Sequence, residues 1–381
     1  MKKNWLVYAF LLLGGGMSMV SCSKDDNNND NQPTQTLFWT DGAGDYSPSS
    51  TSNKLTLPQL SGALDLTAGR AVSLAKEEAD TTKAQLSLTN FFPEQAKVVF
   101  DNVDMTQGTD GTSYSFTAST TIDGDTLAAT GTLKGIGSAN KELSLTTRRG
   151  VNAFSPLVGT WQLTFDPTTK AADVFLKVNT GDAATDTQYG MMGSLLGGAI
   201  AAKVKEVDVY LTQDGLFDFK WMPVDTDGLV GMPAAVKAMG VTIPYYITNN
   251  NSTLNIAIDK NLIPLLGQLV STLGAGNPAL KDLDLTTLIP ALVQAKVILD
   301  QGGFYAIPLQ ASASGNTAQF FVGKDMLAPL MTALSPMLSG LLTSLPADEQ
   351  AAIGQILQSL PTVIGSASQF DFGLGFTKAA N

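Results

Sequence analysis

Carboxylates are the side chains in this sequence best able to do catalytic chemistry, because its 381 residues include no histidine. A Ser-His-Asp triad, a Cys-His dyad and the usual zinc sites are therefore excluded. Three acids stand together in 77–80, and Asp101 and Asp104 follow. Two facing acids could hydrolyse a glycosidic bond, but adjacent acids in a polar segment are typical of a solvated loop. We expect no catalytic residues and keep a carboxylate-based glycan hydrolase as a remote alternative.

One short segment has the pattern of a calcium-binding loop. In Asp225-Thr226-Asp227-Gly228, alternate carboxylates could point to one cation, and the glycine allows a sharp bend. The acid that would close such a loop is missing, because Ala235-Val236 stands at its position. A plain turn is the simpler interpretation. We therefore expect neither a metal site nor a cofactor.

The only cysteine, Cys22, has the sequence context of a lipid attachment site. Lys2 and Lys3 precede a short apolar stretch, and the small residue Ser21 stands directly before the cysteine. This arrangement resembles a signal peptide ending in a lipobox, in which the cysteine thiol takes up a diacylglyceryl group. We expect residues 1–21 to be a signal peptide and Cys22 to anchor the mature chain. The alternative is an ordinary secreted protein with an unrelated cysteine.

A polar tether is predicted after the cysteine, over residues 22–53. Its first charged residues, Lys24, Asp25 and Asp26, resemble the export signal that places lipoproteins of Gram-negative gut anaerobes on the outer face of the outer membrane. We expect a lipid-anchored protein at the cell surface, with the periplasmic face as the alternative. The net charge of −11 argues against nucleic acid as a partner. The adjacent arginines Arg148-Arg149 are typical of a solvated strand end.

Residues 54–152 show the alternation of a β protein. Apolar residues alternate with serine and threonine most clearly over 113–122. Asp123-Gly124 then supplies a hairpin turn into 127–133. Strands at this spacing, with little helical signal, predict an N-terminal antiparallel β sandwich or barrel.

Residues 153–381 combine strands with apolar helices. The Asp214-Gly215 turn lies between two alternating runs, which predicts an antiparallel hairpin. The uncharged run 326–345 is long enough to cross a membrane, but its prolines favour short packed helices. We expect a β-barrel with several inserted apolar helices, and a mostly β, α+β protein overall. The helical stripes are Met192, Leu196 and Ile200; Leu262, Leu266, Leu269 and Leu273; Leu285, Leu288, Ile289 and Leu292; and Ile353, Ile356, Leu357 and Leu360.

The start and the end of this second domain suggest a family. Gly159 and Trp161 begin an antiparallel run, and apolar residues alternate strictly over 370–376 at the end of the chain. This pattern resembles the calycin-like (lipocalin-like) domains of surface lipoproteins of gut anaerobes, which are of unknown function. The resemblance implies a barrel with Trp161 packed across its closed base, and an N-terminal companion β domain.

The apolar helices exceed what one small barrel can bury, so something must cover them. They either pack on each other and on the sheet, or they enclose a cavity for an apolar small molecule. We therefore expect a membrane-anchored, non-enzymatic binding module. The alternative is a structural or adhesive subunit of an outer-membrane complex, with the helices docked on a partner protein. The candidate wall residues of a cavity are Phe217, Phe219, Trp221, Tyr245 and Tyr246.

Overall fold

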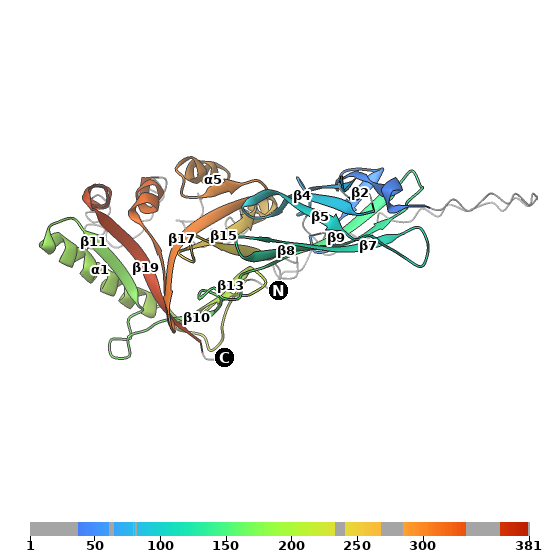
Figure 1. Ribbon diagram of the computed structural model, residues 1–381. Helices are drawn as coiled ribbons and strands as arrows, with labels where there is room; N and C mark the ends of the chain where they lie inside the picture. Colours follow the sequence, from blue (N-terminus) through green and yellow to red (C-terminus); the bar gives the residue numbers. More distant parts are fainter. Residues whose placement is uncertain are drawn as a thin grey trace, which may run out of the picture. The chain divides into compact units, whose positions relative to one another are not determined.

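The computed structural model describes residues 37–60, 65–78, 80, 82–232, 241–267, 285–332 and 359–379. Leu37–Asn381 form one compact unit. The fold is mostly β, as the sequence predicts (Figure 1). Cys22, Lys24, Asp25 and Asp26 lie outside the described residues.

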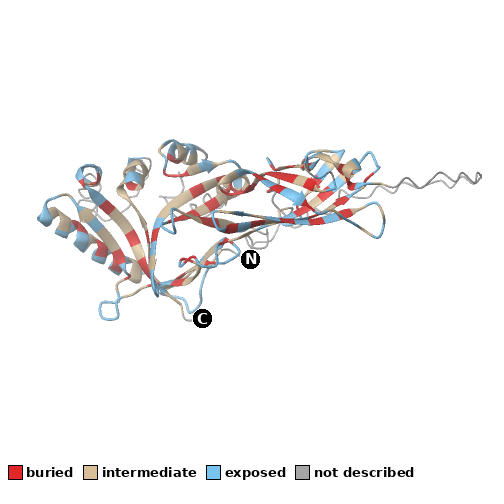
Figure 2. Cartoon of the chain, in the orientation of Figure 1, coloured by how far each residue is buried: buried red, intermediate tan, exposed pale blue. Residues whose placement is uncertain are grey.

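Two sheets at the N-terminal side share one apolar core and form a β sandwich. Buried leucines of both sheets, such as Leu88 and Leu133, belong to the same cluster, and buried positions recur along the strands (Figure 2). One sheet has the order β1-β3-β4-β5: Gly44–Tyr46, Ala71–Lys76, Ala84–Phe92 and Gln95–Val103. The other has the order β2-β9-β8-β7-β6: Asn53–Thr56, Lys141–Gly150, Asp125–Lys134, Tyr114–Ile122 and Thr106–Gln107.

The strongest local prediction, the hairpin at Asp123-Gly124, is confirmed. Both residues have positive φ, 52° and 88°, as a two-residue turn between twisted strands requires. The turn joins β7 to β8, with Ile122 opposite Asp125. One pair departs from the expected antiparallel pattern, because β2 pairs with β9 in parallel.

The sandwich also begins earlier in the chain than the sequence suggests. The 3-10 helix η1 (Trp39–Gly42) and strand β1 lie inside the range 22–53 that was expected to be a tether. Trp39 and Tyr46 are buried in the sandwich core. Two isolated aromatic residues in a polar segment are enough to hold it to the sheets, although they give no periodic signal.

A closed antiparallel barrel of eight strands follows. It closes where β19 pairs with β10, with Trp161 opposite Lys378 and Leu163 opposite Phe376. Two more strands extend the sheet: β11 (Val174–Asn179) pairs with β19, and β16 (Leu299–Gln301) pairs with β17. The barrel strands β10, β12, β13, β14, β15, β17, β18 and β19 span Gly159–Leu163, Val204–Leu211, Leu216–Pro223, Ile243–Thr248, Thr253–Asp259, Phe304–Ser314, Thr317–Val322 and Gln369–Lys378.

Trp161 lies in the core of this barrel and is fully buried. Its indole Nε1 donates a hydrogen bond to the backbone oxygen of Leu157 at 2.7 Å. The Lys378 ammonium lies 5.4 Å from the centre of the Trp161 ring. Gly159 has a φ of 143°, and a Cβ there would come within 2.9 Å of the Lys378 side chain.

Helix α1 (Ala183–Ala201) packs on β11 through glycines rather than through its predicted apolar stripe. The buried positions are Tyr189, Gly193 and Gly197, whereas Leu195 is 74% exposed. Since glycine has no side chain, the helix backbone can approach the strand closely at these two positions. Of the predicted stripe, Met192 and Ile200 pack against buried clusters beside this contact, and Leu196 is 40% exposed.

The other helices are described only in part. Helix α5 (Leu285–Gln294) coincides with one predicted stripe and packs near Tyr305 and Ile307 of β17. The 3-10 helix η2 (Lys260–Leu262) follows β15, and residues 263–267, 324–332 and 359–366 are also helical. The remaining stripe residues Leu269, Leu273, Ile353, Ile356 and Leu357 lie outside the described residues.

Candidate functional site

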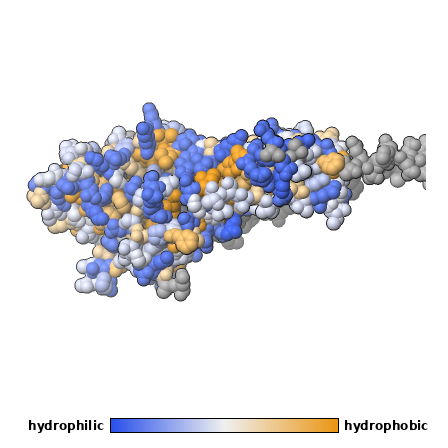
Figure 3. All heavy atoms as spheres, in the orientation of Figure 1, coloured by the Kyte–Doolittle hydropathy of each residue, from blue (hydrophilic) through white to orange (hydrophobic). Residues whose placement is uncertain are grey.

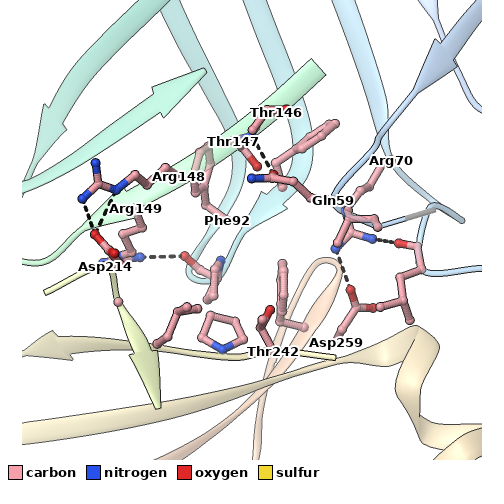
Figure 4. Close-up of a pocket in the computed structure, with 18 of the residues that line it drawn as sticks. Gln59, Arg70, Phe92, Thr146, Thr147, Arg148, Arg149, Asp214, Thr242 and Asp259 are labelled. Atoms are coloured by element: carbon pink, nitrogen blue, oxygen red, sulfur yellow. Dashed lines mark hydrogen bonds and ion pairs between the residues drawn. The ribbon is translucent and has the colours of Figure 1, made fainter. Parts of the chain in front are cut away.

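A pocket of about 760 Å³ lies between the sandwich and the barrel (Figure 4). We call it the interdomain pocket. Its size is within the usual range for small-molecule sites. The barrel contributes Asp259 and Phe304, which lie on the opposite face of the sheet from the core residue Tyr245. The pocket is therefore outside the barrel and not in its interior.

Arg70 is the most deeply buried charged residue of this pocket. It precedes β3, and only 4% of it is exposed. One Nη2–H group donates to Asp259 Oδ2 at 2.6 Å, and an Nη1–H group donates to the backbone oxygen of Leu66. The guanidinium carbon lies 6.0 Å from the Phe91 ring centre and 5.7 Å from the Phe304 ring centre. The third guanidinium nitrogen, Nε, is buried, and its N–H has no hydrogen-bond partner among the described residues.

Asp259 holds several parts of the site together at the end of β15. Its Oδ1 accepts a hydrogen bond from the backbone N–H of Asn261 at 2.9 Å, while Oδ2 receives Arg70. The Asn261 amide in turn donates to the backbone oxygen of Ala68 at 3.1 Å. These bonds fix the loop before β3 against the barrel, so the position of Arg70 is set by both domains.

The adjacent arginines have different environments, because neighbouring residues of a strand point to opposite faces. Arg148 is exposed and pairs with Asp214, with 2.9 Å from Nε to Oδ1. Arg149 is partly buried, with its side chain only 9% exposed. It donates from Nε to Asp125 Oδ2 at 2.8 Å and lies 5.0 Å from the Tyr246 ring centre. The expectation of a solvated strand end therefore holds for Arg148 and is wrong for Arg149.

Burial raises the pKa of two groups near Arg149. Desolvation raises the pKa of the Glu94 carboxyl, although the nearby Arg149 charge acts in the opposite direction. Desolvation also raises the pKa of Tyr246 to about 12. Both groups are therefore kept in their protonated forms to higher pH than in water.

The acids of the interdomain pocket are poorly arranged for hydrolysis. Among its described lining residues the acids are Asp214 and Asp259, and each is ion-paired with an arginine. The acids singled out in the sequence have other partners: Asp101 accepts from Gln85 at 2.8 Å, and Asp104 pairs with Lys83. Chemically, the pocket offers paired charges, hydroxyl groups and apolar walls for binding.

The structure does not bring all five predicted cavity residues together. Phe217, Phe219 and Trp221 form a row on one face of β13, with ring centres 6.2 and 5.3 Å apart. Tyr245 is buried in the barrel core and donates to the backbone oxygen of Thr212 at 2.7 Å. Tyr246 lies on the other face of β14, in a different cluster. None of these five residues belongs to the described lining of the interdomain pocket.

The calcium-like segment is an exposed turn in the structure. Lys205 Nζ lies 3.5 Å from Asp227 Oδ1 and donates to the backbone oxygen of Thr226 at 2.9 Å. The Lys205 ammonium therefore lies beside the Asp227 carboxylate, where a bound metal ion would have to be. Among the described residues, no group of three or more acids or cysteines could hold a metal ion.

Comparisons with protein families, with curated protein sequences and with solved structures give no match to this chain. Within the described part of the chain, no helix is both long enough and apolar enough to cross a membrane. On the face seen in Figure 3, hydrophilic residues cover most of the surface, and hydrophobic residues form small patches between them.

Proposed function

We propose that this chain is a lipid-anchored binding protein that displays a small-molecule site, the interdomain pocket, at the cell surface. The observation that carries the proposal is the buried Arg70 in the wall of a pocket of about 760 Å³, with one donor that has no partner among the described residues. An unsatisfied buried donor is costly, and a ligand oxygen would satisfy it.

The anchoring part of this proposal rests on the sequence. Cys22 would carry the lipid, and Lys24, Asp25 and Asp26 would direct the protein to the outer face of the outer membrane. We also propose, from the sequence, that the barrel is calycin-like. The support for this identity is the closed eight-strand barrel with Trp161 buried in its core.

A binding role is preferred to an enzymatic one because of the ion pairs. A glycosidase needs one carboxyl group that carries a proton and a second that is free to act as base or nucleophile. Both described acids of the pocket are instead paired with arginine, so neither carboxylate is free to act as a base or nucleophile. Hydrolysis therefore remains the remote alternative.

Native mass spectrometry of the lipidated protein purified from its own membranes tests the proposal. The wild type should carry or accept a small molecule in the interdomain pocket. Thr130→Trp should abolish this, because Thr130 is an exposed lining residue of β8 where an indole would fill the pocket. Ser115→Trp is the matched control: Ser115 is exposed on the neighbouring strand and is not among the described lining residues. Equal occupancy in all three proteins would reject the pocket as the site.

Helix α1 favours a second proposal, a structural or adhesive subunit that docks on an outer-membrane protein. Met191 is 59% exposed and Leu195 is 74% exposed on a helix with no charge after Asp186. Exposed apolar helix faces are typical of protein contacts. Crosslinking on cells followed by size-exclusion chromatography tests this role, since a stable complex lost in Leu195→Glu would support it.

An apolar ligand at the barrel is the third proposal, and the row Phe217, Phe219 and Trp221 supports it. Phe219 is 40% exposed although Val209, opposite it on β12, packs against the barrel core. Binding of a fluorescent fatty acid that is lost in Trp221→Ala would support this site. A Trp221→Ala protein that binds the probe as the wild type does would remove it.

A further inference from the structure

The charges around the interdomain pocket restrict the charge of a ligand. Every ionic side chain in its described lining is already paired with an opposite charge. A carboxylate ligand would approach Asp214 or Asp259, and an ammonium ligand would approach an arginine, so either would meet a like charge in a partly desolvated site. The arrangement favours a neutral ligand. The pairs are Arg70–Asp259, Arg148–Asp214 and Arg149–Asp125.

The Arg70 side chain specifies one feature of that ligand. Its Nη atoms donate to Asp259 and to the backbone of Leu66, which leaves the buried Nε–H without a partner among the described residues. A guanidinium has donors and no acceptor, so its ligand partner must be an acceptor such as a hydroxyl, ether or carbonyl oxygen. A neutral oxygen can accept this bond without adding charge beside Asp259.

The other polar groups of the wall can both donate and accept. A threonine hydroxyl does both, and Gln59 uses its Oε1 to accept from the backbone N–H of Thr147 at 3.0 Å. The Gln59 amide nitrogen is then the group available as a donor. Such a wall matches a ligand that carries several hydroxyl groups, since each hydroxyl also donates and accepts. The threonines are Thr130, Thr146, Thr147 and Thr242.

The rest of the lining is apolar. Leu60, Leu216 and Leu262 contribute aliphatic surface, and Phe91 and Phe304 contribute the rings that flank Arg70. A ligand that consisted only of polar groups would leave this surface uncovered, and a purely apolar ligand would bury the Arg70 donor without a partner. The lining therefore fits a molecule with hydroxyl groups on one side and C–H groups on the other.

We infer that the interdomain pocket binds a neutral, hydroxyl-rich small molecule of the size of a short sugar, and that one of its oxygens accepts a hydrogen bond from Arg70 Nε. This inference rests on the proposed function, because it names the ligand class of the same site. It departs from the apolar ligand expected from the sequence, since that ligand is expected in a cavity enclosed by the helices and lined by other residues.

The test uses the full lipidated chain in a sugar-free detergent, with isothermal titration calorimetry. Maltose, cellobiose and lactose are the neutral probes, and glucuronate and decanoate are the charged ones. We expect at least one neutral disaccharide to bind more tightly than either charged probe. Thr130→Trp should abolish this binding, and Ser115→Trp should leave it unchanged.

Arg70→Lys tests the hydrogen bond itself. Lysine keeps a positive charge beside Asp259 but lacks the Nε donor of the guanidinium. Loss of a hydrogen bond from a charged donor should weaken disaccharide binding by about tenfold or more. An unchanged affinity in Arg70→Lys, with an unchanged melting temperature, would overturn the role of Nε.

The failure of the ligand class is distinguishable from failure of the site. If glucuronate or decanoate binds more tightly than the disaccharides, and Thr130→Trp blocks that binding, the ligand is not neutral but the pocket is still the binding site. If none of the probes binds, the inferred class is wrong, and native mass spectrometry of the purified protein decides on the pocket separately. Binding of disaccharide that Thr130→Trp does not affect would overturn both.

Discussion

Arg70 and Asp259 are 189 positions apart in the sequence, and their side chains form an ion pair with 2.6 Å between Nη2 and Oδ2. The two side chains are only 4% and 7% exposed. Because Arg70 precedes β3 of the sandwich and Asp259 ends β15 of the barrel, the pair joins the two domains. The same arginine lines the interdomain pocket, so one contact contributes both to stability and to the site.

Asp259→Ala should strongly destabilise the protein. Removing one partner of a buried ion pair leaves the other charge without compensation, which typically costs about 3–5 kcal/mol. The substitution also removes the acceptor for the Asn261 backbone N–H. We expect the free energy of unfolding to fall by about 3 kcal/mol or more, measured by urea denaturation with tryptophan fluorescence.

An exposed ion pair provides the control for this measurement. Asp227, paired with Lys205, is fully exposed, so Asp227→Ala should change the urea midpoint very little. The double variant Arg70→Met with Asp259→Leu should recover much of the stability lost in Asp259→Ala, because it leaves no unpaired charge. Equal effects of Asp259→Ala and Asp227→Ala would contradict the burial of the Arg70–Asp259 pair.

The glycines of α1 give opposite predictions at neighbouring positions. A Cβ at Gly197 would lie 2.2 Å from the backbone oxygen of Ala172, whereas nothing lies within 4 Å of a Cβ at Gly198. Gly197→Ala should therefore cost about 1–3 kcal/mol through forced movement of helix and strand. Gly198→Ala should gain about 0.5–1 kcal/mol, because alanine is the better helix former. Two variants of equal melting temperature would show that α1 does not pack on β11 in this way.

Local patterns in the sequence predict much of the β structure. The alternation over 113–122 and the Asp123-Gly124 turn correspond to β7, its turn and β8. The alternation over 370–376 lies within β19, the strand that closes the barrel. These features depend on residues close together in the chain, so period-two patterning and turn chemistry are sufficient to find them.

The candidate site could not be found in the same way. Arg70 and Asp259 come from different domains, and nothing in the residues around either one indicates a buried partner. The parallel pairing of β2 with β9 is also non-local, and the residues of a strand as short as β2 do not indicate which strand it pairs with. By contrast, the placement of Tyr245 and Tyr246 in one cavity wall is wrong for a local reason: neighbouring residues of a strand point to opposite faces, and the two tyrosines lie in different clusters.

Buried tyrosines should make the fold sensitive to alkaline pH. Desolvation raises the pKa of Tyr46 and of Tyr246 to about 12, above the ordinary value of 10.0. A raised pKa means that the folded state holds its proton longer than the unfolded state, so this contribution to stability is fully present below pH 10 and is lost as the pH rises towards 12.

The measurement is the urea midpoint followed from pH 9 to about 11.5, together with tyrosinate absorbance. The midpoint should fall as the pH rises, and the fall should be shallower in the double variant Tyr46→Phe with Tyr246→Phe, which cannot ionise at these positions. A wild type and a double variant with parallel pH profiles would show that these phenols are accessible to water in the folded state.

The anchor gives the most direct prediction from the sequence. Cys22→Ala should abolish incorporation of a fatty-acid analogue and release the protein from membranes, because the lipid on Cys22 is the anchor that the sequence predicts. Replacing Lys24, Asp25 and Asp26 by alanine should leave the protein anchored but protected from protease added to intact cells. The matched control is Lys54→Ala, a charged residue of β2 whose loss should alter neither property. Retention of Cys22→Ala in membranes after a carbonate wash would point to insertion of the uncharged run 326–345, and protease resistance of the unmodified protein would place it on the periplasmic face.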